Sequence, residues 1–208
     1  FNSDNLKKKI LLNAIEIAIF DGWSSKTLLE ASLLCGVKST DTKKLFPRGG
    51  LDLARYYHEY EDDLFLNSLR KIDFNNLSQF EKIELSLFKR FEIISVNKEA
   101  FRRSMSLFAL PFHQIEGLNL VFSTCDLIWV EIGDKSLEYD WYTKRLILVS
   151  IYLSSLLYLF GDDSSNNEQT FQYISRRLKE IKKLGKIKID TSDLFSYFNN
   201  KILNNILN

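Results

Sequence analysis

Apolar residues recur at intervals of three or four along most of the chain, which is the spacing of one face of an α-helix. The segments that show this spacing after the first seventy residues are 77–97, 100–108, 118–133, 142–160 and 168–183. No stretch alternates between apolar and polar residues as a half-buried strand would. The pattern predicts an all-α protein with about nine or ten helices.

The first fifty residues divide into three short helices. The first has an apolar face made of Leu6, Ile10, Leu11, Ala14, Ile17 and Ala18. Gly36 is placed to end the second, and Pro47 with Gly49-Gly50 breaks the chain before a long fourth helix over about 51–71. We therefore expect a helix-turn-helix head over 1–50, a helical ligand-binding and dimerisation body over 51–188, and an amphipathic helix over 189–208.

The head resembles that of the TetR family of DNA-binding repressors. The marks of this likeness are Ala14, Gly22-Trp23, Gly36-Val37 and Phe46-Pro47. Two features depart from it: Lys43 replaces an aromatic phosphate contact, and Arg48-Gly49-Gly50 follows the proline in place of the usual lysine-acid pair. In addition, Asp41 falls in the middle of the recognition helix. Little in that helix is suited to reading bases. A TetR-type ligand-responsive transcriptional repressor is therefore the alternative function, and nucleic acid is not the expected partner.

Charge is unevenly distributed along the chain. The net charge of the 208 residues is +1, which gives no overall attraction to nucleic acid or membrane. Counted along the sequence, 51–140 holds 10 basic and 16 acidic side chains, whereas 141–208 holds 10 basic and 6 acidic. Most of the later bases lie between Arg176 and Lys188. The acidic run Glu59, Glu61, Asp62 and Asp63 is expected on the solvated face of the fourth helix.

Residue types needed for catalysis are scarce. The two histidines, His58 and His113, cannot supply the paired Glu-x-x-His motifs of a di-iron site in a helical bundle. His113 and Glu116 are expected to make a contact at a helix start. No glycine-rich phosphate loop is present, and Cys35 and Cys125 are expected to be buried thiols without zinc or a disulfide. We predict no catalytic residue, no metal, no cofactor and no enzymatic activity.

The longest apolar run, 146–160, is shorter than the ~18 residues that a membrane-spanning helix needs. Serines at 150, 154 and 155 interrupt it. We expect this run to form the central buried helix of a bundle.

Several motifs together resemble one family. Trp23, the corner Phe46-Pro47-Arg48-Gly49-Gly50 and the run 140–145 (Asp-Trp-Tyr-Thr-Lys-Arg) are similar to the Coq-nine family of ubiquinone-biosynthesis accessory proteins. The likeness extends from about Leu6 to Lys183. It implies a TetR-like fold without gene regulation. It also implies a homodimer that lies peripheral to the inner membrane, on the bacterial cytoplasmic or mitochondrial matrix side, holds an isoprenoid lipid or phospholipid, and presents quinone precursors to the di-iron demethoxyubiquinone hydroxylase.

A bound lipid needs a cavity lined by side chains without charge. The candidate lining residues are Met105, Phe108, Leu110, Phe112, Val121, Phe122, Ile128, Trp129, Ile147 and Ile151. The same residues could instead form a solid core, because apolar stripes at helical spacing usually do. The resemblance favours the cavity and leaves the identity of the lipid open.

A second candidate site surrounds Trp141. Exposed Trp and Tyr beside Arg are typical of binding hot spots, and the resemblance points to this patch as the contact for the hydroxylase. The candidate partner-binding residues are Leu137, Glu138, Asp140, Trp141, Tyr142 and Arg145. The alternative is that Trp141 anchors the start of its helix in the core.

The end of the chain carries a candidate membrane-binding helix. Its apolar face is made of Leu194, Phe195, Phe198, Ile202, Leu203 and Ile206, and asparagines fill the opposite face. The basic residues between 176 and 188 would face anionic headgroups. The alternative is a helix docked on the dimer partner or on the body of its own chain.

Overall fold

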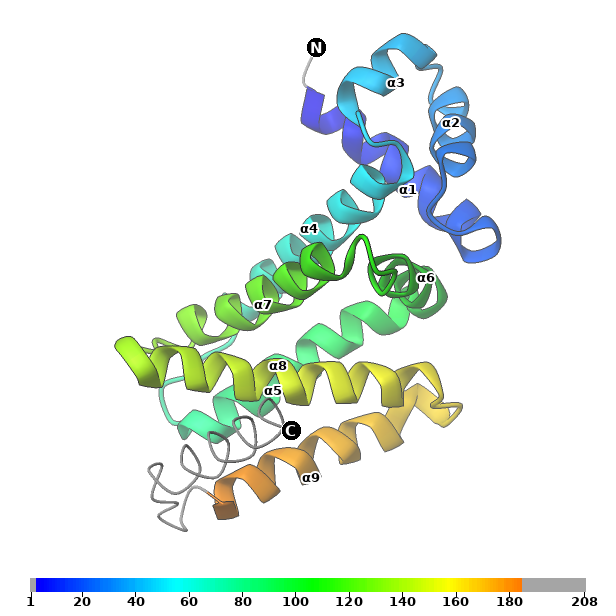
Figure 1. Ribbon diagram of the computed structural model, residues 1–208. Coiled ribbons are helices and arrows are strands. Elements are labelled where there is room, and N and C mark those ends of the chain that lie inside the picture. Colours follow the sequence, from blue (N-terminus) through cyan, green and yellow to red (C-terminus); the bar gives the residue numbers. More distant parts are fainter. Residues whose placement is uncertain (1–2, 185–208) are drawn as a thin grey trace, which may run out of the picture.

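The computed structural model describes residues 3–184. These residues form nine α-helices and a short 3-10 helix, with no strand among them, so the expected all-α fold is confirmed (Figure 1). The helices are α1 Ser3–Asp21, α2 Ser25–Leu34, α3 Ser39–Leu45, α4 Gly50–Leu69, α5 Gln79–Val96, α6 Lys98–Phe108, α7 Gln114–Glu131, α8 Glu138–Phe160, η1 Ser165–Asn167 and α9 Glu168–Leu184. The helix expected over 189–208 lies outside the described residues.

Helices α1 to α3 form a small head at one end of the molecule, and α4 runs from it into the body (Figure 1). Local signals in the sequence set the ends of these helices. The Ser24 side chain accepts a hydrogen bond from the backbone N–H of Thr27 at 3.1 Å and so caps α2. Gly36 follows α2 with φ of +68°, a left-handed conformation that costs glycine little.

The corner between α3 and α4 requires its glycines for two different reasons. Gly49 has φ of +65°, in the left-handed region. At Gly50 a Cβ atom would lie 2.4 Å from the carbonyl oxygen of Trp23, so no larger residue fits without moving the backbone. The two glycines thus let α4 start directly against the loop that contains Trp23.

Head and body are joined by specific contacts. The Trp23 indole N–H donates to the carbonyl oxygen of Ala100 at 2.9 Å, and its ring stacks on Tyr57 with centroids 4.7 Å apart. Arg48 donates two hydrogen bonds of 2.8 Å to the carboxylate of Glu116 in the first turn of α7, as well as binding Asp52. These contacts fix the head against α6 and α7.

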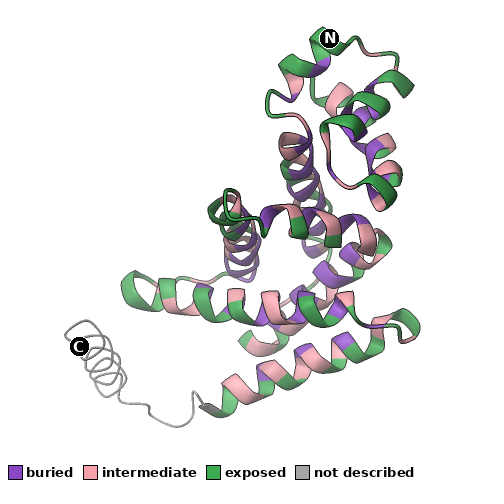
Figure 2. Cartoon of the chain, turned by 45° about the vertical axis from the view of Figure 1, so that its right-hand side comes forward, coloured by how far each residue is buried: buried purple, intermediate pink, exposed green. Residues whose placement is uncertain are grey.

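The body packs α4 to α9 around an apolar core. Buried positions lie on the faces that the helices turn toward one another, and exposed positions lie on the outer faces (Figure 2). Helix α8 packs against α7 on one side and α9 on the other. A capping box starts α5, in which the Ser78 side chain accepts from the backbone of Glu81 and the Glu81 side chain accepts from the backbone of Ser78.

Helix α8 lies between α7 and α9, as expected of a central helix, but it is buried along one face only. Its inner face holds Leu148, Ile151, Tyr152, Ser155, Leu156 and Leu159. On its outer face Leu146 is 59% exposed and Leu157 is 74% exposed. Within 3–184 it is the one helix whose length and composition would allow it to cross a membrane. In its most apolar 18-residue stretch, 39% of the residues are buried against the rest of the protein. A core helix of a soluble protein has the same properties.

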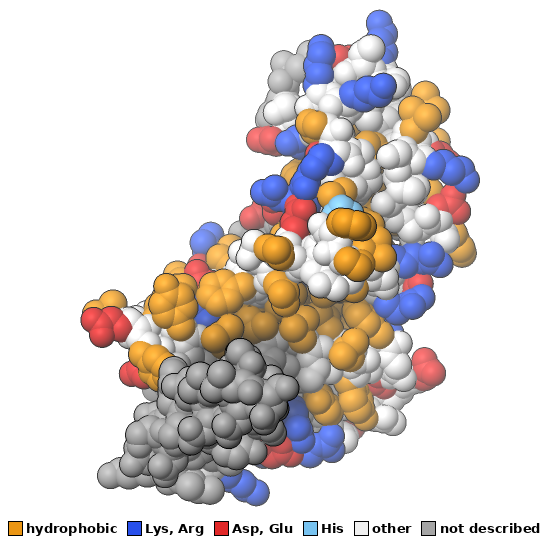
Figure 3. Space-filling model, in the orientation of Figure 1, with side chains coloured by type: hydrophobic (Ala, Val, Ile, Leu, Met, Phe, Trp, Pro, Cys, Tyr) orange, Lys and Arg blue, Asp and Glu red, His pale blue; other side chains and the backbone are white. Residues whose placement is uncertain are grey.

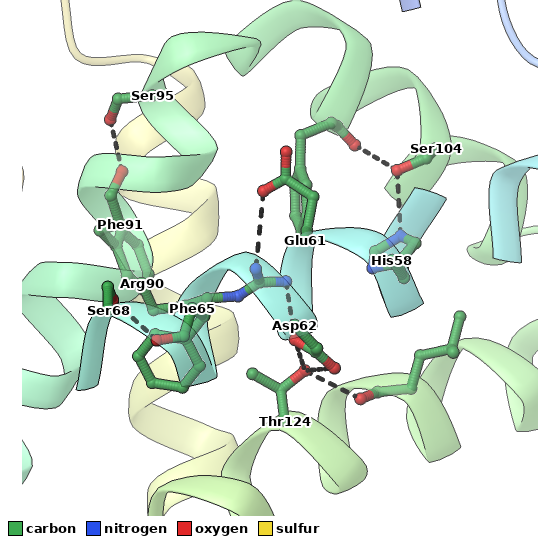
Figure 4. Close-up of polar contacts among 12 residues, drawn as sticks. His58, Glu61, Asp62, Phe65, Ser68, Arg90, Phe91, Ser95, Ser104 and Thr124 are labelled. Atoms are coloured by element: carbon green, nitrogen blue, oxygen red, sulfur yellow. Dashed lines mark hydrogen bonds and ion pairs between the residues drawn. The ribbon is translucent and has the colours of Figure 1, made fainter. Parts of the chain in front are cut away.

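The acidic run on α4 is not a solvated face, which corrects the sequence-based expectation. Glu61 is buried and Asp62 is largely buried, and both carboxylates face the guanidinium of Arg90 on α5 (Figure 4). The distances from Arg90 are 3.5 Å to Glu61 and 3.1 Å to Asp62. The helical period explains the error, since Glu61 follows Tyr57 by four residues and precedes Phe65 by four, both in the core. Only Glu59 and Asp63 lie on the exposed side.

Both cysteines are free thiols. Cys125 is buried, as expected, and burial raises the pKa of its thiol. Cys35 is only half-buried, at the end of α2, where its sulfur accepts a hydrogen bond from Asn13.

Candidate functional site

A small apolar pocket lies between α5, α7, α8 and α9. Its volume is about 240 Å³. It is lined by Gln79, Phe80, Ile83, Trp129, Lys144, Ile147, Leu148, Ile151, Leu178 and Ile181. Drug-sized ligands occupy pockets of about 300–1,000 Å³, so this pocket can hold the end of a long lipid but not all of it.

Helical spacing brings the lining residues together. Phe80 and Ile83 are three residues apart on α5, and Leu178 and Ile181 are three apart on α9. From α8 the pocket receives Ile147, Leu148 and Ile151, which follow one another over a single turn. Helices α5, α8 and α9 each contribute apolar side chains from about one turn, and α7 contributes Trp129. These side chains meet around the pocket.

Three of the lining residues carry polar groups, Gln79, Trp129 and Lys144, although almost all of the surface that lines the pocket is apolar. Trp129 is 6% exposed, and within 3–184 its indole N–H has no hydrogen-bond acceptor. The ammonium of Lys144 lies 5.4 Å from the centre of the indole ring, in cation–π contact. The same ammonium donates to the carboxylate of Asp134 at 2.8 Å.

Asp134 is a buried carboxylate that two cations share. It binds Lys144 and also Arg145, whose guanidinium lies 3.3 Å away. Burial by itself would raise the pKa of Asp134, but the hydrogen bonds from Lys144 and Ser136 and the adjacent charges hold it at about 2. Asp134 is therefore ionised at neutral pH and compensates the charge of Lys144.

The candidate partner-binding residues form one surface around the start of α8. Leu137 is 79% exposed and Tyr142 is 59% exposed, and Glu138 and Asp140 are also exposed. Trp141 is half-buried, and the Arg145 guanidinium lies 3.9 Å from the centre of its ring. We call Leu137, Trp141 and Tyr142 the α8 patch. Figure 3 shows many apolar side chains on the surface of the body, below the head.

Arg145 does not lie on that surface. It is 2% exposed and binds Asp126 on α7 as well as Asp134. Its buried guanidinium therefore holds the Trp141 ring in position and is not itself accessible to a partner.

The predicted lipid-binding residues are dispersed. Trp129, Ile147 and Ile151 line the pocket. Phe108, Val121 and Ile128 are buried in the core and do not line this pocket, and Met105 is half-buried between α6 and α8. Leu110 and Phe112 are exposed, and Phe122 packs against Trp141 with ring centroids 5.9 Å apart.

The remaining predicted sites fall partly beyond the structure. The apolar face from Leu194 to Ile206 lies outside the described residues. On α9, Arg176, Lys179, Lys182 and Lys183 are exposed and available to an anionic surface. In residues 3–184 no cluster of three or more His, Cys, Asp or Glu side chains is arranged to hold a metal ion.

The helix that would read DNA, α3, carries Lys43 and Lys44, and Lys43 is exposed with no ion pair among the described residues. Lys44 lies 3.5 Å from Asp41 on the same helix. Arg48, the next cation along the chain, is engaged by Asp52 and Glu116. The hydrogen bonds that Arg48 donates to Glu116 and Asp52 raise the pKa of its guanidinium above its already high value.

Known proteins resemble this chain along most of its length. A family model described as COQ9 matches residues 115–185, which run from α7 to the end of α9. The probable ubiquinone biosynthesis protein coq9, mitochondrial, of Dictyostelium discoideum is 28% identical over 97% of this chain. The resemblance to the COQ9 family is confirmed. The COQ9 proteins of Rattus norvegicus and Homo sapiens, also named mitochondrial, are 25% and 24% identical over 88% of this chain.

The chain is shorter than these COQ9 relatives. It spans 67% of the Dictyostelium protein and 61% and 60% of the rat and human proteins. Among solved structures, a TetR transcriptional regulator from Nitrosomonas europaea superimposes with a TM-score of 0.69, covering 85% of this chain and 97% of the other. At 19% sequence identity that likeness shows the TetR-like fold and nothing further.

Sequence reasoning missed the residues that α5 and α9 bring to the pocket. Their apolar periodicity was visible, but periodicity shows which face of a helix is buried and not which helix it meets. Lys144 was part of a recognised motif, and its place over Trp129 follows only from the packing of α7 against α8.

Proposed function

We propose that this chain is a non-catalytic, lipid-binding accessory protein of ubiquinone biosynthesis. On this proposal it binds isoprenoid or quinone precursors at the membrane and presents them to the demethoxyubiquinone hydroxylase. The observation that carries the proposal is an apolar pocket between α5, α7, α8 and α9, in a chain similar to proteins named for ubiquinone biosynthesis.

The size and lining of the pocket support a lipid as its ligand. Eight of the ten lining residues are apolar, and the volume of about 240 Å³ suits one end of a long chain. Burial of apolar surface favours binding by roughly 25 cal/mol for each Å² removed from water. The rest of such a molecule would remain outside, where an enzyme can reach it.

The α8 patch supports docking of the hydroxylase. Leu137 and Tyr142 are exposed, and Trp141 is held in place by Arg145 and Phe122. Rigid aromatic groups that need little ordering are typical of binding hot spots. The patch is also close in sequence to the pocket, since Tyr142 and Lys144 lie on the same turn of α8.

The proposal places the protein peripherally on the inner membrane as a homodimer. Exposed bases on α9 support attraction to anionic headgroups, each contributing about 1 kcal/mol near the surface. The amphipathic sequence pattern of 189–208, which lies outside the described residues, supports an interfacial segment.

A ligand-responsive repressor is the second candidate, favoured by the TetR-like fold. The contacts of the head argue against it. Repressor binding to DNA depends on free cations facing the phosphates, and Arg48 is engaged by two carboxylates.

The quinone profile of cells depleted of this protein, measured by mass spectrometry, tests the proposed function. We expect ubiquinone to fall and the demethoxy intermediate to accumulate. Normal quinone levels together with altered transcription of neighbouring genes would favour the repressor instead.

A further inference from the structure

The Trp141 ring of the α8 patch is held by side chains from both neighbouring helices. Phe122 on α7 packs against it with ring centroids 5.9 Å apart, and the Arg145 guanidinium lies 3.9 Å from its centre. Arg145 also donates to the backbone carbonyl oxygen of Trp141 at 3.2 Å, so it contacts both the ring and the main chain of that residue. The orientation of the ring therefore depends on where Arg145 is held.

Arg145 is anchored to two different elements. Its Nε donates to Asp126 on α7 at 2.5 Å, and its Nη1 donates to Asp134, in the loop between α7 and α8, at 3.3 Å. The side chain of Arg145 is 2% exposed, and a buried guanidinium cannot exchange its carboxylate partners for water. Asp126 therefore ties Arg145 to α7, and Asp134 ties it to the loop.

Asp134 fastens this loop to both helices. Its backbone N–H donates to the carbonyl oxygen of Trp129, near the end of α7, at 2.9 Å. Its carboxylate accepts hydrogen bonds from Lys144 on α8 at 2.8 Å and from the Ser136 hydroxyl, in addition to the one from Arg145. The side chain of Asp134 is 3% exposed, so its partners enclose it. One buried residue thus joins α7, the loop and α8.

The loop leads into a residue with an unfavourable backbone conformation. Glu138, the first residue of α8, has φ of +53°, in the left-handed region that is costly for a residue with a side chain. Such a conformation persists only where the surrounding structure imposes it, and it is found most often at functional sites. Leu137, directly before it, is 79% exposed and contributes little packing. The buried contacts of Asp134 are therefore the ones that anchor this part of the chain.

We propose that Asp134 is a positioning residue of the α8 patch, which holds Arg145 and, through Arg145, keeps the Trp141 ring in the orientation that a docking protein binds. Asp134 itself is buried and touches no partner. Because the ring is already ordered, docking does not have to order it first, and the affinity is correspondingly higher. This inference rests on the proposed docking of the hydroxylase at the α8 patch and identifies what holds that surface in place.

Fluorine NMR of protein labelled with 5-fluorotryptophan reports on the Trp141 ring in the absence of any partner. The variant Trp141→Phe assigns its resonance. Asp134→Asn keeps the shape of the side chain and removes its charge. Glu131→Gln is the matched control, because Glu131 lies at the end of α7 and its carboxylate pairs with Arg70 instead of Arg145. We expect the Trp141 resonance to be shifted or split in Asp134→Asn and unchanged in Glu131→Gln.

Surface plasmon resonance with the purified demethoxyubiquinone hydroxylase measures the effect on docking. If the ring of Asp134→Asn is in the docking orientation about one tenth of the time, the dissociation constant rises about tenfold. Glu131→Gln should bind as the wild type does. In a Trp141→Ala background, Asp134→Asn should change the dissociation constant by no more than about twofold, because a residue that acts through the ring has no effect once the ring is gone.

Melting curves show whether each variant is folded at the temperature of the measurements. If Asp134→Asn is not, Ser136→Ala replaces it, since this variant removes one hydrogen bond to Asp134 and keeps every charge. Smaller changes of the same kind are then expected in the Trp141 resonance and in the dissociation constant.

The results separate the inference from the proposed function on which it rests. If the Trp141 resonance of the folded variant is that of the wild type, or if its loss of affinity is as large in the Trp141→Ala background, Asp134 does not act through the ring. The inference is then wrong and the docking surface stands. If the wild type does not bind the hydroxylase, the proposed docking fails and the inference fails with it.

Discussion

At the scale of single residues, the least expected feature is the buried charge cluster around Arg90. Arg90 is fully buried and faces Glu61 and Asp62, and its Nε donates to the hydroxyl of Tyr152 on α8 at 3.2 Å. Close by, His58 and Ser104 share a 3.0 Å hydrogen bond (Figure 4). One guanidinium cannot fully compensate two carboxylates in a medium of low dielectric constant.

Burial therefore raises the pKa of Glu61 to about 7, against the opposing effect of Arg90. Because the folded protein holds this proton more tightly than the unfolded chain, the stabilisation is complete below pH 4.5. It is lost as the pH rises through about 7. Relative to Glu61→Gln, which does not titrate, we expect the wild type to lose on the order of 3 kcal/mol of unfolding free energy across this window.

Urea denaturation of both proteins at a series of pH values measures the difference. His58 works in the opposite direction, since burial lowers its pKa to about 3 and makes the folded state lose stability as the pH falls below 6.5. It is present in both proteins, so its contribution cancels. Parallel pH profiles for the two proteins would show that Glu61 is not protonated in the fold.

At the scale of elements, the helices were largely predictable and their outer faces were not. The apolar period located α1 and α5 to α9, whereas Gly36, Pro47 and the Gly49-Gly50 pair separated α2, α3 and α4. The start of α8 was missed, because 134–140 reads as a charged turn. Helix α8 instead begins at Glu138. The acidic side chains of Glu138 and Asp140 in its first turn interact favourably with the positive end of the helix dipole.

Helix α8 offers a test of the docking surface. Tyr142→Ala and Leu137→Ala remove exposed side chains of the α8 patch, so we expect melting temperatures near that of the wild type. We expect each to weaken binding of the demethoxyubiquinone hydroxylase about tenfold, as truncation at a hot spot does. Surface plasmon resonance with the purified hydroxylase measures this effect.

Leu157→Ala is the matched control, since Leu157 is 74% exposed on the same helix and belongs to its other end. Equal binding by all three variants and the wild type would exclude the α8 patch as the contact. Trp141→Ala is less informative, because Trp141 also packs against Phe122 and Arg145 and its loss lowers stability.

At the scale of the whole molecule, the pocket is a property of how four helices meet. Sequence periodicity indicated Trp129, Ile147 and Ile151 as apolar candidates, and these do line it. It also indicated Val121 and Ile128, which pack in the solid core. Nothing in the spacing separates a residue that faces a cavity from one that faces a neighbouring side chain, since both lie on the buried face of a helix.

The central claim is that this pocket holds a lipid in the cell. The most direct test is mass spectrometry of the lipids extracted from protein purified under mild conditions, comparing the wild type with Ile151→Trp and with Leu157→Trp as the control. We predict polyprenyl or quinone lipid in the wild type and the control, and its loss from Ile151→Trp. Wild-type protein without bound lipid, or a folded Ile151→Trp carrying the same lipid in the same amount, would contradict the account.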